Sequence, residues 1–341
     1  MSTDKNISKW IFIGGAPRSG TSLLQAIFNQ HSECTSPPES HIKESFVYSP
    51  TTKRAKSLYD HKSLREFLKS DKWIPRLNID PQSILDKFPE GSAPTKLFTL
   101  YMEEYAAREG KSILVEGAPF NIWFMKKLYV DFPGCYILHI VRDPRDVVMS
   151  TMKAHYNTNM DFPLENVAGQ FMESYLQGPL FGVKYYGERY IKIYYEDLVS
   201  HPEETIQYMC NRLNIPFEET MLSFQESSKK VAAAEEGWKS NLSKPFIKDN
   251  FNKWKTEMKL EDIIRVEYIC SEFFEKEKEH YQLSEFSRTS WTVVQKALLP
   301  LRIKNLKKNL RLILKGKKTK EQLDHLPAHE RLRSMGMLKE D

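Results

Sequence analysis

Short apolar runs alternate along this chain with longer stretches in which apolar residues return at every third or fourth position. Such runs are typical of strands buried in a parallel sheet, and the longer spacing is typical of amphipathic helices. The pattern predicts strands at 11–13, 112–116, 135–141 and 190–195. Because helical stretches separate these strands, we expect an α/β fold with a central parallel sheet flanked by helices.

A long polar segment, residues 43–110, is expected to be mostly helical. Its clearest part is a helix at 95–108, closed by Gly110. We interpret the segment as a helical insertion that covers the functional site; a helical layer packed on the sheet is the alternative. Further helices are predicted to begin near Thr21, Pro119 and Asp146, and to span 164–186, 202–213 and 260–276.

The first predicted strand runs into a glycine-rich turn, GGAPRSGTS at 14–22. Such a loop aims backbone N–H groups and the positive end of a helix at one point, which favours phosphate or sulfate. Arg18 adds a planar charged fork suited to oxyanions, and Thr21 and Ser22 can cap the helix. A plain strand–turn–helix is one alternative. A triphosphate loop is another, but Thr21 stands where that motif requires lysine.

Polar residues also follow the later strands. Arg142 ends the third strand, Ser150 lies two turns into the next helix, and Tyr195 ends the fourth strand. Ligands of open parallel sheets gather at these carboxyl ends. Together with Arg18, this edge suits a ligand with two separated anionic groups and an aromatic base. Arg142 and Arg145 could instead pair with Asp143 and Asp146 in a surface turn. We favour pairing for Arg145 and a ligand for Arg142.

The stretch at 31–41, HSECTSPPESH, contains Pro37 and Pro38 and cannot be a helix. We expect a loop or short extended piece that returns toward the sheet with Glu39 on it. An exposed loop carboxylate is the plain alternative for Glu39. His41 is a weaker candidate for a base, and His31 is expected to order the loop.

The composition, 40% hydrophobic and 28% charged over 341 residues, indicates a globular protein. No apolar run reaches the ~18–20 residues of a membrane span, and the first ten residues lack the apolar core of a secretory signal. The four cysteines have no metal or redox spacing, so we expect reduced packing residues in a cytoplasmic protein. Residues 227–258 are polar and basic, typical of an exposed loop or of a loop over a charged ligand.

The net charge of +5 is concentrated in one segment: residues 301–320 hold nine Lys or Arg and no acid, so the remainder sums to −4. Residues 287–341 are therefore predicted to form a basic C-terminal extension. Its helix at 298–315 carries an apolar stripe, which suits peripheral binding at the inner face of a membrane or self-association. Packing back on the chain's own body is the alternative. No nucleic-acid-binding module is recognisable.

These motifs together resemble a known family. Residues 16–24 (APRSGTSLL), the pair Arg142 and Ser150, and residues 194–202 (YYEDLVSHP) are similar to sulfotransferases that use 3′-phosphoadenosine 5′-phosphosulfate (PAPS). The spacing of His31 and Glu39, and of Lys244-Pro245 and Trp254, is closest to the protein-tyrosine sulfotransferases and their bacterial relatives. The resemblance covers roughly 8–40, 111–155, 189–220 and 238–281. It implies a P-loop nucleotide-hydrolase-like sulfotransferase fold within a domain at 1–286.

The resemblance also implies roles for single residues. Arg142 and Ser150 would hold the 3′-phosphate, and Tyr195 and Lys244 would contact the adenosine bisphosphate. Glu39 would be the general base, because an acceptor hydroxyl must lose its proton as it attacks sulfur. Arg18 would also stabilise the leaving phosphate oxygen, and no metal would be required. The 5′-phosphosulfate would be wrapped by Arg18, Ser19, Gly20, Thr21, Ser22 and Leu23.

One departure concerns the second strand, where tyrosine sulfotransferases carry a lysine before Asp-Pro. This chain reads Glu116-Gly117-Ala118-Pro119, so another cation would be needed; Lys126 and Lys239 are candidates. The acceptor-binding segments do not match either. We therefore expect transfer to a glycan, a lipid-linked sugar or a natural-product alcohol rather than to protein tyrosine. A nucleotide-dependent kinase of the P-loop class and a non-catalytic nucleotide-binding module are the alternative functions.

Overall fold

The computed structural model describes residues 7–43, 61–71, 73–89, 91–156, 163–227, 231, 242–248 and 250–285. The extension predicted at 287–341, with its basic helix, and Lys239 lie outside these residues. The described residues form two compact units. Unit 1 takes those within Met1–Gly15, Gly20–Ile140 and Phe181–Ile247, and unit 2 takes those within Ala16–Ser19, Val141–Leu180 and Lys248–Asp341. The glycine-rich loop therefore contributes residues to both units.

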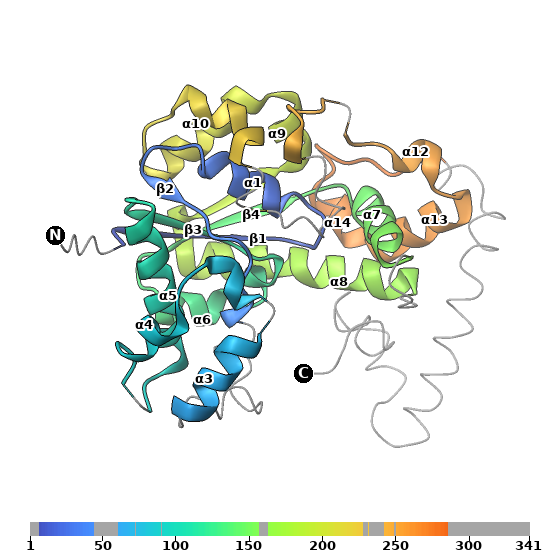
Figure 1. Cartoon of the computed structure of the whole chain (residues 1–341). Coiled ribbons are helices and arrows are strands. Elements are labelled where there is room, and N and C mark those ends of the chain that lie inside the picture. The colour runs from blue at the N-terminus through green and yellow to red at the C-terminus, as the bar shows by residue number, and fades with distance from the viewer. Residues whose placement is uncertain are drawn as a thin grey trace, which may run out of the picture. The chain divides into compact units, whose positions relative to one another are not determined.

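A five-stranded parallel sheet organises unit 1, with the strand order β2-β3-β1-β4-β5 (Figure 1). Its strands are β1 Lys9–Gly14, β2 Cys34–Thr35, β3 Ile113–Gly117, β4 Tyr136–Val141 and β5 Tyr190–Tyr194. The four predicted strands are confirmed, and the extended piece expected at 31–41 is the edge strand β2. In the parallel pairs the carboxyl ends share one edge, so the glycine-rich loop, Ser36 and Ala118 all follow strands at that edge.

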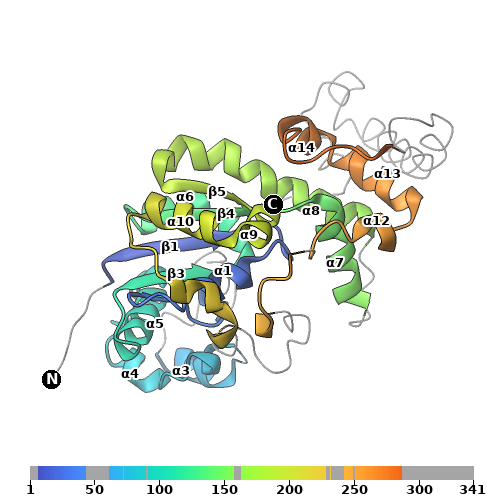
Figure 2. The same ribbon diagram turned by 90° about the horizontal axis from the view of Figure 1, so that it is seen from above.

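Helices cover both faces of this sheet. In Figure 1, α1, α9 and α10 lie on one side and α4, α5 and α6 on the other. Figure 2 shows α3, α4 and α5 gathered beside β3. The helices of unit 1 are α1 Thr21–Phe28, α3 His61–Ser70, η3 Ile74–Leu77, α4 Pro81–Leu85, α5 Pro94–Arg108, η4 Pro119–Ile122, α6 Met125–Asp131, η6 Gly187–Arg189, α9 Tyr195–Ser200, α10 Pro202–Leu213 and η7 Glu219–Ser227.

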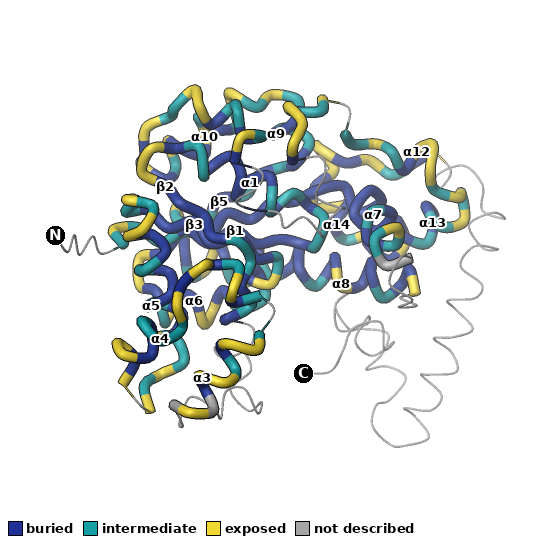
Figure 3. The backbone as a smooth tube through the Cα atoms, in the orientation of Figure 1, coloured by how far each residue is buried: buried dark blue, intermediate teal, exposed yellow. Residues whose placement is uncertain are grey.

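The core of unit 1 lies between the sheet and α5. Phe12 and Leu114 of the sheet join Leu97 and Tyr101 of α5 in one buried apolar cluster. Helix α5 ends at Arg108, and Gly110 follows in a left-handed conformation (φ 67°), as its sequence predicts. Figure 3 shows β3, β4 and the second half of β1 as largely buried, whereas buried and half-buried residues alternate along β5. Helix α5 therefore forms a helical layer on the sheet, which was the alternative interpretation of residues 43–110. The prediction that this segment covers the functional site stays a prediction.

Unit 2 consists mainly of helices: α7 Pro144–Tyr156, α8 Leu164–Gln177, α12 Trp254–Glu257, α13 Leu260–Ile269 and α14 Ser271–Lys276. Aromatic rings join α8 to α14. The Phe273 ring lies 5.2 Å from that of Phe171 and 4.9 Å from that of Tyr175, measured between centroids. Edge contacts of this kind stabilise aromatic pairs beyond the area that they bury.

The structure differs from the predicted elements at several boundaries. The helix predicted at 164–186 stops at Gln177 and continues as a π-helix, η5 Gly178–Tyr186, since Pro179 can neither donate to nor fit the α-helical ladder. The helix predicted from Pro119 is divided into η4 and α6, and the one at 260–276 is divided at Cys270. Tyr195 is the first residue of α9 rather than the last of a strand.

The four cysteines are buried and free, as packing residues should be. Burial raises the pKa of the Cys135 thiol to about 11 and that of Cys210 to about 12, so both are protonated at neutral pH. Among the described helices, none has the length and apolarity to cross a bilayer.

Candidate active site

The glycine-rich loop enters α1 through Gly20, which occupies the N-cap position in a left-handed conformation (φ 110°). Its carbonyl oxygen accepts hydrogen bonds from the N–H groups of Leu23 and Leu24 at 3.0 and 3.2 Å. The prediction that Thr21 and Ser22 cap the helix was wrong, because α1 begins at Thr21 and its cap residue has no side chain. Within the described residues, the N–H groups of Thr21 and Ser22 have no such partner and are left for an external acceptor such as an anion.

Tyr195 is buried against this loop. A Cβ atom at Gly20 would lie 2.7 Å from Cδ2 of the Tyr195 ring, so only glycine fits between the ring and the helix start. The structure thus places Tyr195 beside the loop, as predicted from its position after β5. Lys244, also predicted to contact the nucleotide, is exposed in the short described stretch 242–248.

Unit 2 brings Arg18, Arg142 and Ser150 together. The Arg18 Nε donates to the Ser150 Oγ at 3.1 Å, and the Arg142 Nη1 donates to the Arg18 carbonyl oxygen at 3.1 Å. The other arm of Arg142, Nη2, donates to the Asn250 carbonyl oxygen at 2.9 Å. Arg18 has a left-handed backbone (φ 72°), which costs about 1–3 kcal/mol for a residue other than glycine. The bond from Arg142 helps to hold that conformation.

Ser19 is fully buried in the same loop. Its N–H donates to the Ala16 carbonyl oxygen at 3.1 Å. Within the described part of the chain, its Oγ has no hydrogen-bond partner. A buried hydroxyl without a partner is unfavourable in the free protein and suits a ligand that brings oxygen atoms. Ser19 therefore fits the predicted phosphosulfate site.

Glu39 lies in the segment that follows β2, and it is half-buried. This segment is fastened to α1: Asn29 exchanges two hydrogen bonds with the backbone of Ser36, at 2.7 and 2.9 Å. Gln25 of α1 also donates to the Ser36 Oγ and to the Pro37 carbonyl oxygen, both at 3.1 Å. The sequence predicted that the chain returns here, and the structure shows that Gln25 of α1 and its C-cap residue Asn29 hold it.

The two neighbouring histidines differ in their surroundings. His31 is fully buried: its Nδ1 accepts from the Glu33 N–H, and its Nε2 lies 3.0 Å from the Pro216 carbonyl oxygen. These contacts fix the loop, as expected for an ordering residue. His41 has a left-handed backbone (φ 53°), and its ring lies edge-on to the Trp73 ring, 4.6 Å away.

The carboxyl end of β3 carries a buried charge pair that the sequence did not reveal. Lys43 forms an ion pair with Glu116, and its ammonium lies 5.1 Å from the centre of the Phe98 ring. The Asn121 Nδ2 also donates to the Glu116 Oε2 at 2.7 Å. Lys43 and Glu116 are 73 positions apart in the chain. They meet because β2 pairs with β3, so that the segment after β2 carries Lys43 to the carboxyl end of β3.

Gly117, which stands where the tyrosine sulfotransferases carry a lysine, is closely packed. A Cβ atom at this position would lie 2.3 Å from the Gln25 side chain, which itself holds Ser36 and Pro37. A longer side chain would displace Gln25 and the start of the Glu39 segment. The packing around Gly117 therefore disfavours a lysine at this position of the chain. Lys126, one of the suggested replacements, is exposed on α6.

Arg145 forms the predicted pair with Asp143, with their closest nitrogen and oxygen 2.6 Å apart. The prediction that this pair lies in a surface turn was wrong, since Arg145 is only 3% exposed. It also pairs with Glu267 at 2.6 Å, and its guanidinium lies 3.7 Å from the centre of the Trp254 ring. Arg145 is therefore a structural residue of unit 2.

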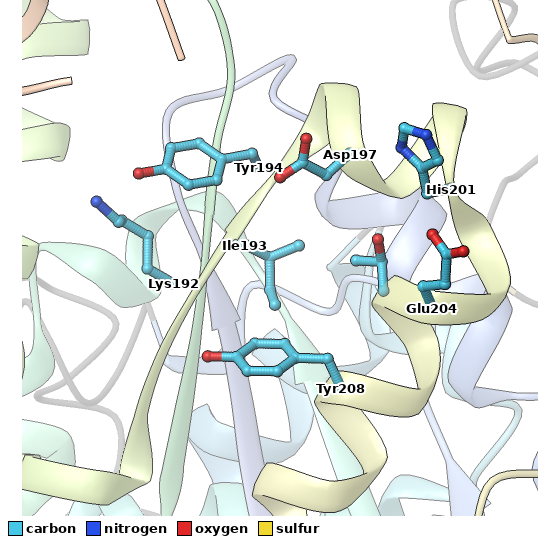
Figure 4. Close-up of a pocket in the computed structure, with 8 residues that line it drawn as sticks. Lys192, Ile193, Tyr194, Asp197, His201, Glu204 and Tyr208 are labelled. Atoms are coloured by element: carbon cyan, nitrogen blue, oxygen red, sulfur yellow. The ribbon is translucent and has the colours of Figure 1, made fainter. Parts of the chain in front are cut away.

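A separate cavity of about 400 Å³ opens beside β5 in unit 1 (Figure 4). Figure 4 shows Asp197, His201 and Glu204 on one side of it and Lys192 on the other. None of the predicted site residues lines it. Within the described residues, no group of three or more His, Cys, Asp or Glu side chains is arranged to hold a metal ion. The lining residues are Lys192, Ile193, Tyr194, Asp197, His201, Glu204, Thr205 and Tyr208.

Comparison with known proteins gives a family match over much of the chain. A family model described as "Sulfotransferase family" matches residues 11–219, which begin within β1 and include the glycine-rich loop and β2 to β5. Protein-tyrosine sulfotransferase 1 of Danio rerio is 22% identical over 268 residues, covering 74% of this chain and 67% of the relative.

Two solved structures share the fold. The sulfotransferase domain from the Synechococcus PCC 7002 olefin synthase has a TM-score of 0.54 at 20% identity, covering 79% of this chain and 97% of that one. The sulfotransferase domain from the curacin biosynthetic pathway has a TM-score of 0.55 at 19% identity, covering 87% and 98%. Both likenesses agree with a central parallel sheet of the P-loop-like sulfotransferase type.

Proposed function

This chain belongs to the sulfotransferase family, and from that premise we propose that it transfers the sulfonate group of PAPS to a hydroxyl acceptor. The observation that carries the proposal is the cluster in unit 2. Arg18, Arg142 and Ser150 are joined by hydrogen bonds next to Ser19, whose buried Oγ has no partner among the described residues. This arrangement offers two guanidinium groups and a hydroxyl to an anion.

In this proposal the donor is held by the residues that the family resemblance assigns. The loop from Arg18 to Leu23 binds the 5′-phosphosulfate, using the N–H groups at the start of α1. Arg142 and Ser150 bind the 3′-phosphate. Tyr195, which packs on Gly20, and Lys244 contact the nucleotide. The buried Ser19 hydroxyl and the uncapped start of α1 both support an oxyanion at the loop.

The Glu39 carboxylate is the proposed general base. It takes the proton of the acceptor hydroxyl while the acceptor oxygen forms a bond to sulfur. The bond between sulfur and the bridging oxygen breaks, and its electron pair stays on the 5′-phosphate of the departing adenosine 3′,5′-bisphosphate. Arg18 and the N–H groups of the loop stabilise that charge. The side chains that fasten Ser36 and Pro37 to α1 support this role by fixing the start of the Glu39 segment.

For the acceptor we propose a glycan, a lipid-linked sugar or a natural-product alcohol. The relative in Danio rerio is named a protein-tyrosine sulfotransferase, which makes tyrosine the main rival. The acceptor-binding segments of the tyrosine sulfotransferases do not match this sequence, which supports the proposal. A tyrosine peptide in an acidic context, tested beside sugar and alcohol acceptors, distinguishes the two.

The experiment is transfer of labelled sulfate from PAPS to a panel of acceptors. We expect transfer by the natural chain and at least a hundredfold loss in Glu39→Gln, as is typical when a general base is removed. Binding of adenosine 3′,5′-bisphosphate should be unchanged in this variant. His41→Gln is the control, because His41 is the rival base. Full activity of Glu39→Gln with loss in His41→Gln would show that Glu39 is not the base.

The same assay separates the alternatives. A P-loop kinase would transfer phosphate from ATP to an acceptor. The sequence speaks against this function, because Thr21 stands where the triphosphate-binding motif has its lysine. A non-catalytic binding module would bind the bisphosphate but transfer nothing to any acceptor, with or without Glu39.

A further inference from the structure

Asp146 is a buried carboxylate that the proposed chemistry does not use. It lies in the first turn of α7, four residues after Arg142, and it is fully buried. A buried carboxylate is unfavourable unless its oxygens are hydrogen-bonded, so its partners indicate its role.

Both oxygens of Asp146 accept hydrogen bonds from a segment more than 100 residues away in the chain. The Asn252 N–H donates to Oδ2 at 2.6 Å, and the Trp254 N–H donates to Oδ1 at 3.0 Å. Asn252 has a left-handed backbone (φ 59°), so the segment turns sharply at this point. Asp146 thus fixes the path of residues 250–254 against the start of α7.

That path determines where the Asn250 carbonyl lies. Asn250 precedes the anchored turn by two residues, and its carbonyl oxygen accepts from the Arg142 Nη2 at 2.9 Å. The other arm of Arg142 donates to the Arg18 carbonyl oxygen. The guanidinium plane of Arg142 is therefore set by two carbonyl oxygens, and Asp146 holds the backbone that supplies one of them.

A second contact holds the same segment independently. The Trp254 ring is buried under the Arg145 guanidinium, 3.7 Å from its centre, and Arg145 is paired with Asp143 and Glu267. Loss of the Asp146 bonds should therefore leave Trp254 anchored and change the turn before it. A conservative variant of Asp146 is expected to fold.

We propose that Asp146 is a positioning residue that orients Arg142 toward the 3′-phosphate of the nucleotide through the backbone of residues 250–254. This inference rests on the proposed function, since it assumes that Arg142 binds the 3′-phosphate. Asp146 itself does not contact the ligand. Its effect should appear in the discrimination between nucleotides with and without a 3′-phosphate.

The test compares the dissociation constants of adenosine 3′,5′-bisphosphate and adenosine 5′-monophosphate by calorimetry. In Asp146→Asn one oxygen is replaced by an NH₂ group that faces a backbone N–H, so one of the two bonds is lost. We expect the preference for the bisphosphate to fall about tenfold, the order of one charge-assisted hydrogen bond. The affinity for the monophosphate should stay within about twofold.

A matched pair at Asn252 tests the same idea without changing the carboxylate. Asn252 is exposed, and glycine tolerates its left-handed backbone whereas valine does not. Asn252→Val should lower the preference in the same direction as Asp146→Asn, and Asn252→Gly should keep it. Lys153→Ala is a further control, since Lys153 pairs with Glu257 on the exposed side of α7 and α12.

Coupling to Arg142 completes the test. If Asp146 acts through Arg142, the double variant Arg142→Ala/Asp146→Asn should have the same preference as Arg142→Ala alone. Additive losses, or an unchanged preference in both Asp146→Asn and Asn252→Val, would overturn the inference. A natural chain that does not prefer the bisphosphate at all would instead contradict the proposed function.

Discussion

Two buried arginines at the end of β4, three positions apart, have opposite surroundings. Arg145 is neutralised by two carboxylates, those of Asp143 and Glu267. Arg142 donates its two arms to backbone carbonyl oxygens, of Arg18 and Asn250. The guanidinium of Arg145 is held in direct ion pairs with carboxylates, whereas carbonyl oxygens orient the guanidinium of Arg142, whose charge also acts on the nearby Asp146 carboxylate.

The same distinction applies to the carboxyl end of β3. There the charge of Lys43 is compensated by Glu116, and the side chain of Gln25 packs directly on Gly117. This strand end therefore supplies packing and positions the Glu39 segment. Positive charge near a strand end is by itself a weak sign of an anion site; the partners of each charge decide its role.

The largest expected effect is on Arg145. Arg145→Ala leaves Asp143 and Glu267 buried without their shared cation, and we expect the free energy of unfolding to fall by about 3–5 kcal/mol. Chemical denaturation without ligand measures this loss. Arg142→Ala removes two hydrogen bonds to carbonyl oxygens and the favourable charge interaction with Asp146, and it should lose clearly less. Equal losses for the two variants would mean that the arginines do not differ in role.

The second prediction concerns Lys43. Lys43→Met removes the cation from buried Glu116, and the free energy of unfolding should fall by about 3 kcal/mol, the lower end of the range for a broken buried pair. Adding Glu116→Gln should restore most of this stability, because the uncompensated charge is then gone. If the double variant is as unstable as Lys43→Met alone, the loss of stability does not come from the uncompensated charge of Glu116.

A smaller effect is expected for Ser19. Ser19→Ala removes a buried hydroxyl that has no partner in the described structure, so stability without ligand should stay the same or rise slightly. The affinity for adenosine 3′,5′-bisphosphate should fall by about 1 kcal/mol, the value of one hydrogen bond, or roughly fivefold. Thr35→Val is the matched control: its hydroxyl is also buried without a described partner, but it lies in β2. An equal loss of affinity in both variants would contradict the assignment of Ser19.

The smallest effect is a pH dependence. Burial raises the pKa of Asp146 above its ordinary value, although Arg142 and the N–H groups of Trp254 and Asn252 act in the opposite direction. Between the ordinary and the raised pKa the folded state binds more protons than the unfolded state. The free energy of unfolding should therefore fall as pH rises through that window. Asp146→Asn should lack this component when unfolding is measured from about pH 3 to about pH 7; an identical profile would contradict it.

Much of the fold could be predicted because apolar patterning is local. The runs that became β1, β3, β4 and β5 are short, apolar and bounded by turn residues, so their burial was readable. The break in the helix at Gly178 was missed although Pro179 signals it. Strand β2 is only two residues long, which leaves little pattern to read.

The site was predictable only in part. Arg18, Arg142 and Ser150 could be grouped because each follows a strand end, and the structure joins them. The roles of Lys43, Gln25 and Asp146 could not be read, since each acts on residues that are far apart in sequence or on backbone groups. Such contacts depend on the path of loops, which carries no periodic signal.

Nucleotide binding tests the central claim most directly. A ligand at about 100 times its dissociation constant stabilises a fold by roughly 2.7 kcal/mol. The thermal unfolding midpoint should therefore rise with adenosine 3′,5′-bisphosphate and change little with ATP or GTP at the same concentration. A rise with ATP and none with the bisphosphate would contradict the proposal that this chain uses PAPS as its sulfonate donor.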